Sequence, residues 1–106
     1  MKLPPKIIDS SYSKNEIVLS FADAIKLIEY LRDKNILVLG WEGWILHMNG
    51  SLGHSISYQG TVDLSNLSPS AALSLVEDTI TESNETWCSN PEIENAELLY
   101  CITLSD

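Results

Sequence analysis

The sequence predicts an α+β fold, with one antiparallel sheet of three to five strands and two helices packed on one face. Two apolar patterns of helical period flank a central stretch that is rich in β-branched and aromatic residues, and a third β-type segment ends the chain. This order, helix, strand, strand, helix, strand, does not alternate as regularly as a parallel doubly wound sheet requires. With 106 residues and 44 % hydrophobic content, the chain is expected to form a single domain, residues 1–106.

Residues 1–15 are expected to form an N-terminal arm rather than a packed element. Pro4 and Pro5 argue against a helix there, and Ser10 to Ser13 are typical of a loop. Only Ile7 and Ile8 give the arm apolar groups to bury. We therefore expect the arm to be less ordered than the rest of the chain.

Two helices are expected, each with a polar residue that caps its start. The first runs from about Phe21 to Lys34, with Ser20 as N-cap and Asp23 three residues later. The second runs from about Pro69 to Ser83, because Ser68 precedes a proline at the first helical position. Residues 84–95 are polar and are expected to form a loop.

The strands are expected in the segments that follow each helix. Residues 36–48 are the densest apolar stretch, and Asn49-Gly50 is a turn signal that would return residues 55–64 as an antiparallel partner. In this returning segment Ile56, Tyr58, Val62 and Leu64 are separated by even steps, so they should share one face. Residues 98–104 predict the last strand.

The charge of the chain is distributed very unevenly. No lysine or arginine follows Lys34, whereas residues 35–106 contain ten carboxylates. The first 34 residues hold six bases and five acids, so the net charge of -9 divides into +1 and -10. Such a surface repels nucleic acid and anionic membrane and attracts basic protein surfaces, although acidity can also serve solubility alone.

No motif for catalysis, for a metal ion or for phosphate binding is present. The five glycines form neither GxxxxGK[ST] nor GxGxxG, and the histidines and cysteines lack the spacing of a zinc site. We therefore expect no cofactor, no metal and no catalytic residue. No apolar run reaches the roughly 20 residues of a membrane span, and no signal region opens the chain, so a cytoplasmic protein is expected. Cys88 and Cys101 are expected to be reduced in that compartment.

Tryptophans and acidic residues are the candidate contacts for a partner protein. Trp41 and Trp44 are separated by an odd step, so in a regular strand one would face the core and the other the surface, although both could also be buried. Trp87 is expected in the loop, either as a plug over the core or as an interface anchor. The candidate partner-binding residues are Trp41, Glu42, Trp44, Asp63, Glu77, Asp78, Glu82, Glu85 and Trp87.

A family resemblance supports the same partner. The Gly-Trp-Glu-Gly-Trp segment at Gly40–Trp44 and the Ser-Leu-Gly-His-Ser turn at Ser51–Ser55, within residues 20–85, resemble immunity proteins of bacterial polymorphic-toxin and contact-dependent growth inhibition systems. The resemblance implies a cytoplasmic, non-catalytic inhibitor. It would cover the active site or substrate groove of one cognate toxin domain, a nuclease such as an RNase with a basic surface.

Two other functions remain open at this level. A small enzyme could use His54 with Cys88 or Asp63, because such groups are assembled in space rather than along the chain. A regulator that mimics DNA could instead present its carboxylates to a DNA-binding protein. That function requires two regular rows of acids rather than one patch.

Overall fold

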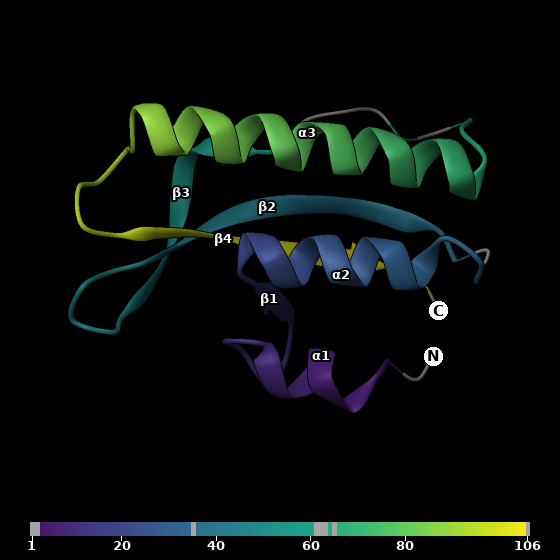
Figure 1. Cartoon of the computed structure of the whole chain (residues 1–106), viewed down its shortest axis with the longest axis horizontal. Helices are drawn as coiled ribbons and strands as arrows, with labels where there is room; N and C mark the ends of the chain where they lie inside the picture. Colours follow the sequence, from purple (N-terminus) through teal and green to yellow (C-terminus); the bar gives the residue numbers. More distant parts are fainter. Residues whose placement is uncertain (1–2, 35, 61–63, 65, 106) are drawn as a thin grey trace.

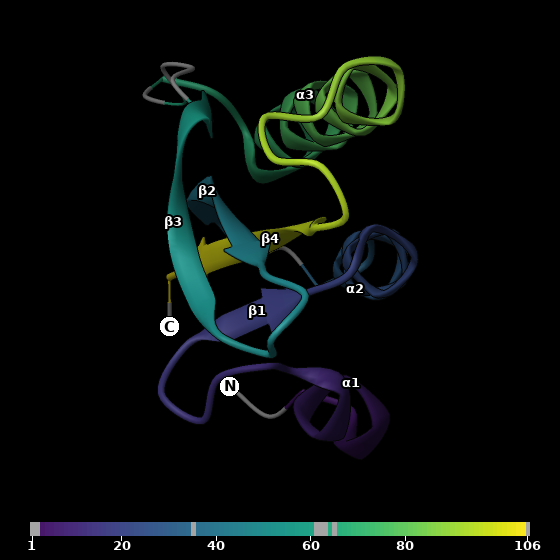
Figure 2. The same cartoon turned by 90° about the vertical axis from the view of Figure 1, so that its left-hand side faces the viewer.

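The chain folds as an antiparallel sheet with helices packed against it, as the sequence predicts. The computed structural model describes residues 3–34, 36–60, 64 and 66–105. The four strands have the order β1-β4-β2-β3, and all neighbours are antiparallel. Along the chain the elements are α1 (Pro5–Ser10), β1 (Ile17–Leu19), α2 (Phe21–Leu31), β2 (Val38–Leu46), β3 (Leu52–Gln59), α3 (Pro69–Ser89) and β4 (Glu97–Leu104). The two long helices, α2 and α3, lie on the same side of the sheet (Figures 1 and 2).

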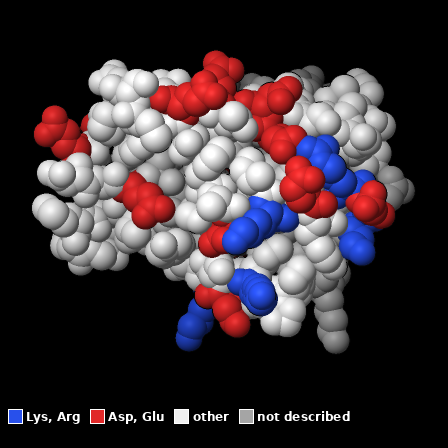
Figure 3. Space-filling view, viewed as in Figure 1, with Lys and Arg blue, Asp and Glu red and all other residues white. Residues whose placement is uncertain are grey.

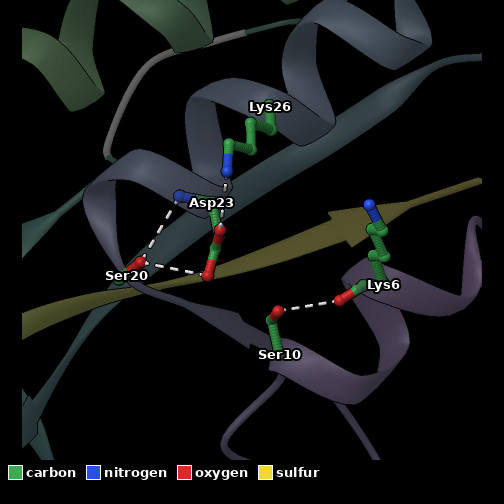
Figure 4. Close-up of polar contacts among 5 residues, drawn as sticks. All are labelled: Lys6, Ser10, Ser20, Asp23 and Lys26. Atoms are coloured by element: carbon green, nitrogen blue, oxygen red, sulfur yellow. Dashed lines mark hydrogen bonds and ion pairs between the residues drawn. The ribbon is translucent and has the colours of Figure 1, made fainter.

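Helix α2 begins at the predicted cap. The Ser20 hydroxyl oxygen accepts a hydrogen bond from the Asp23 backbone N–H at 3.3 Å, and the hydroxyl donates to the Asp23 carboxylate at 3.3 Å (Figure 4). Lys26 lies one further turn along, with its Nζ 3.9 Å from the same carboxylate. These contacts satisfy an amide that the helix cannot bond internally, which fixes where the helix starts.

Helix α3 also begins at its predicted cap, where the Ser68 hydroxyl accepts from the Ala71 backbone N–H at 3.1 Å. The expected end at Ser83 and the expected loop from residue 84 are wrong, because the helix continues to Ser89. The residues beyond Ser83 are polar, but Trp87 is buried against the core. Packing of this side chain outweighs the weak helix propensity of its polar neighbours.

The N-terminal residues form a helix that the sequence did not predict. Pro5 occupies the first helical position of α1, where a missing N–H costs no hydrogen bond, so the two prolines begin the helix instead of preventing it. The Ser10 hydroxyl donates to the Lys6 carbonyl at 2.7 Å (Figure 4), and Ile7 is buried. Strand β1, which follows, was not expected either and adds an edge to the sheet next to β4.

The main core lies between the sheet and the two long helices. Tyr100 of β4 is at its centre, with ring centroids 5.3 Å from Trp41 and 6.2 Å from Phe21. Its hydroxyl is buried and has no hydrogen-bond partner among the described residues, which costs about 1–3 kcal/mol. The helices contribute Leu27, Ile28, Leu31, Leu73, Val76 and Ile80.

None of the helices in the described residues is both long and apolar enough to cross a membrane.

Strand β2 directs alternate side chains to opposite sides of the sheet. Trp41 and Ile45 belong to the main core, whereas Trp44 and Leu46 pack on a second apolar cluster. Cross-strand pairs share a face, so the register identifies the residues on the side away from α2 and α3. We call this side the open face; its residues are Val18, Glu42, Trp44, Leu46, Leu52, His54, Glu97, Leu99 and Cys101.

Strand β3 bulges where it crosses Gly43. Glu42 pairs with Gln59 and Trp44 pairs with His54, so residues 55–58 of β3 stand opposite Gly43 alone. A side chain at Gly43 would collide with the Tyr58 carbonyl oxygen and Cβ. The expectation of one shared face is wrong for Ile56 and Tyr58, because Ile56 is 89 % exposed while Tyr58 packs against the core. Val62 lies outside the described residues.

Replacing Gly43 should therefore disrupt the hairpin. We expect Gly43→Ala to lower the free energy of unfolding by about 1–3 kcal/mol, because the backbone of β3 must move to admit a methyl group. Denaturant unfolding measures the change. Gly53→Ala is the matched control, since its methyl group would meet only the tip of the His47 side chain, at 3.3 Å. Equal stability of Gly43→Ala and the wild type would contradict the close strand crossing.

Candidate partner-binding site

The structure separates the predicted partner-binding residues instead of gathering them in one patch. Trp41 and Trp87 lie in the core, the acids of α3 lie on the helix side, and Glu42 and Trp44 lie on the open face. Asp63 lies outside the described residues. The sheet stands between the acids of α3 and Glu42, so one contact surface cannot use both fully.

Trp41 and Trp87 are structural residues in the free protein. Trp41 is 5 % exposed, and its indole N–H donates to the Thr79 hydroxyl at 2.9 Å, which joins β2 to α3. Trp87 is 7 % exposed and meets the Tyr58 ring edge-on, with centroids 5.4 Å apart. Of the two roles considered for Trp87, plug and anchor, its position matches the plug. Neither ring is available to a partner at the surface.

The acids of α3 form a stripe on the helix side. Asp78, Glu82 and Glu85 are exposed, and within the described part of the chain none of them forms an ion pair. Glu77 differs, because it pairs with Arg32, which also lies 3.2 Å from Glu29. These two carboxylates raise the pKa of Arg32, Glu77 being the larger cause. Figure 3 shows red carboxylates along α3 and blue lysine and arginine atoms below them, so both signs of charge occur on this side.

Three side chains make a polar cluster on the open face, which we call the Trp44 cluster: Glu42, Trp44 and His54. The Trp44 indole N–H donates to Glu42 Oε1 at 3.3 Å, and His54 Nδ1 lies 3.6 Å from Glu42 Oε2. The Trp44 and His54 rings are 4.6 Å apart between centroids and tilted by 45°. The cluster therefore combines an aromatic surface, an acceptor and an imidazole at one point of the sheet.

An apolar layer supports the Trp44 ring from below. Trp44 and Leu46 pack on Val18, Leu99 and Cys101, all of which are buried. Burial, and to a smaller extent the nearby carboxylates of Glu16 and Glu42, raise the pKa of the Cys101 thiol to about 11. The thiol is thus kept protonated, and its surroundings are both apolar and negatively charged.

The partner strand of this cluster is positioned by a residue that sequence reasoning missed. Glu92, in the loop between α3 and β4, accepts hydrogen bonds from the Ser55 hydroxyl at 2.8 Å and from the Ser57 backbone N–H at 3.2 Å. Ser55 is buried and its hydroxyl oxygen accepts from the Tyr58 backbone N–H at 2.9 Å. Glu92 therefore fixes the bulge that follows His54. No local pattern identifies a loop glutamate 35 residues away from Ser57 as its partner.

His54 was considered only as a possible catalytic residue, yet the sequence does carry a signal for its position. The hairpin turn at Asn49-Gly50 places Leu46 opposite Leu52, and the same register places Trp44 opposite His54. Counting outward from the turn would have paired these two rings. The expectation that Trp41 and Trp44 face opposite sides is confirmed by the burial of the first and the half-exposed position of the second.

The sheet separates one of the two possible catalytic pairs, His54 with Cys88, and Asp63 of the other pair lies outside the described residues. His54 lies on the open face, whereas Cys88 lies on α3 beyond the other face of the sheet. Among the described residues no group of three or more histidine, cysteine, aspartate or glutamate side chains is placed to hold a metal ion.

A hollow of about 550 Å³ lies at the β1 edge, between α1 and the segment before β1, and its lining includes Ile7, Ile8 and Ile17.

The comparisons with known proteins identify no relative. No protein-family model, no curated protein and no solved structure matches the chain. The chemistry of the candidate site must therefore be inferred from its own residues.

The contact between Glu92 and the bulge should depend on pH. The Ser55 hydroxyl, assisted by the backbone amides of Ser57 and Ile56, lowers the pKa of Glu92 from its ordinary value of 4.5. A carboxylate with a lowered pKa in the folded state stabilises that state above the unfolded pKa, and the contribution is lost as pH falls through the lowered value. We expect the Ser57 amide to be protected at neutral pH, and its protection relative to the intrinsic exchange rate at each pH to fall as Glu92 titrates below pH 4.5.

The amide resonances of residues 55–58 should report this titration in an NMR experiment. Glu92→Gln is the control, because an amide side chain keeps an acceptor oxygen but has no carboxyl proton to gain. A Glu92 midpoint at or above 4.5 would contradict the assigned hydrogen bonds.

Proposed function

We propose that this protein is a bacterial immunity protein of a polymorphic-toxin or contact-dependent growth inhibition system. It acts in the cytoplasm and binds one cognate toxin domain with a basic surface, of the nuclease type such as an RNase. Binding covers the active site or the substrate groove of the toxin, and the immunity protein itself performs no chemistry.

One observation supports this proposal: the strands that form the open face carry a partly exposed tryptophan beside a carboxylate, and they contain no lysine or arginine. Strands β2, β3 and β4 contain no lysine or arginine, and Trp44 is only half-buried among them. Tryptophan is enriched where proteins bind one another, and carboxylates at the surface attract a basic partner. The acids of α3 extend the negative field over the other side of the molecule.

Inhibition by an acidic protein follows from the chemistry of the proposed target. A nuclease must hold a phosphate backbone, so its substrate groove is lined with lysine and arginine. A carboxylate surface meets the same groups and excludes the nucleic acid. The net charge of -9 also accelerates the encounter with a basic domain, by steering that salt screens.

Growth protection tests the proposal. Cells that express the toxin domain encoded beside this gene should survive when this protein is co-expressed, and the purified pair should associate. We expect the association rate to reach about 10⁸ M⁻¹s⁻¹ at low salt and to fall at least tenfold between low and physiological ionic strength.

An unrelated nuclease toxin domain of similar net charge is the control, and it should not be neutralised. Failure to bind or protect against the neighbouring toxin would contradict the proposed function. Equal protection against both toxins would mean that the protein acts as a non-specific polyanion instead.

A further inference from the structure

We propose that the open face is the contact surface, and that the Trp44 cluster receives one cationic side chain of the partner, an arginine or a lysine. The inference rests on the proposed function, because the partner is the basic toxin domain. It adds which side of this protein binds and which chemical group is recognised there.

The Trp44 ring is held in place before any partner arrives. Its lower side packs on Leu99 and on the buried layer around Cys101, and its indole N–H is bonded to Glu42. His54 lies beside it, on the neighbouring strand. A side chain that is fixed in the free protein loses little conformational entropy on binding, which favours its use as an anchor.

Glu42 retains the capacity to bind a further donor. Each of its oxygens has one neighbour, at 3.3 Å for Trp44 Nε1 and 3.6 Å for His54 Nδ1, while a carboxylate can accept about four hydrogen bonds. Its side chain is 39 % exposed, so a ligand can reach it. A carboxylate beside a tryptophan suits a guanidinium, which donates to the acid while its plane lies against the ring, within about 6 Å of its centre.

The sign of the charge distinguishes the open face from the helix side. Glu97 and Glu42 lie on the open face, because in the strand register they stand opposite Leu46 and Cys101. Strands β2, β3 and β4 contain no lysine or arginine. Glu16 adds a further acid at the β1 edge, where its charge helps to raise the pKa of the Cys101 thiol.

The helix side carries both signs of charge. Lys26 belongs to α2, Arg32 and Lys34 follow at its end, and Arg32 already pairs with Glu77 of α3. Figure 3 shows blue lysine and arginine atoms together with red carboxylates on this side of the molecule. A basic partner would be repelled by part of the helix side, whereas strands β2, β3 and β4 carry the carboxylates Glu42 and Glu97 and no lysine or arginine.

Substitutions on the two sides of the sheet test the inference with the intact protein and the neighbouring toxin domain. On the open face, Glu42→Gln removes the charge of an exposed carboxylate, and we expect it to weaken binding by about 10- to 100-fold through faster dissociation. The matched control is Glu82→Gln with Glu85→Gln on α3, which removes two exposed charges on the other side. This control should change affinity less than about threefold, by slowing association alone.

Two changes at Trp44 probe the aromatic contact. Trp44→Phe keeps an aromatic face and should retain most of the affinity for the toxin domain. Trp44→Leu should bind the toxin domain about tenfold more weakly than Trp44→Phe. Thermal unfolding of each variant verifies that the fold is kept, and Glu42→Gln supplies the test even if Trp44→Leu unfolds.

The outcomes separate the two proposals. If the wild type binds and protects but Glu42→Gln retains full affinity while the α3 pair loses it, the contact lies on the helix side and this inference is overturned, with the proposed function intact. If the wild type does not bind the toxin, both fall. If Glu42→Gln and Trp44→Leu lose affinity while the α3 double variant changes little, the result supports the Trp44 cluster as the binding site.

Discussion

Strand β2 places its side chains in two different environments, and the rest of the molecule depends on this alternation. Trp41 and Ile45 face the long helices and build the main core together with Tyr100. Glu42 and Trp44 face away from the helices, over the smaller apolar cluster. One segment of sequence thus supplies both the hydrophobic contact that holds α3 on the sheet and the polar group that we propose as the binding site.

The β3 bulge gives the open face its local shape. Gly43 has no side chain, so β3 can cross β2 closely, and residues 55–58 form a bulge opposite it. Glu92 holds the far side of this bulge through Ser55 and Ser57. Because His54 directly precedes the bulge, these contacts also fix where the imidazole stands relative to Trp44 and Glu42. The cluster is thus supported by backbone geometry on β3 and by packing on β2.

Local chemistry predicted the starts of the two long helices and the hairpin turn, but not the end of α3 or the first helix. The caps Ser20 and Ser68, the turn at Asn49-Gly50 and the alternation of Trp41 and Trp44 each act over a few residues, and each was readable from the sequence. The end of α3 was not, since it depends on where Trp87 finds a pocket in the core. Helix α1 was missed because a proline that prevents a helix in the middle favours one at the start.

The candidate site shows the same limit. Acidity and tryptophan content predicted a partner-binding surface, but only the fold distributes these residues between the two sides of the sheet. Trp87 looked equally suited to a surface and to the core because its neighbours in the chain are polar. Pairing of Glu77 with Arg32 and of Glu92 with the bulge joins residues distant in sequence, so neither could be inferred from spacing.

The three indole N–H resonances of the protein provide the most direct test of the claim that the open face binds the partner. Trp41 and Trp87 are buried on the helix side of the sheet and serve as internal references, whereas Trp44 is half-exposed beside Glu42. On addition of the toxin domain, the account predicts that the Trp44 indole signal shifts strongly while the signals of the two buried indoles stay near their free positions. Formation of the complex with an unchanged Trp44 signal would contradict it.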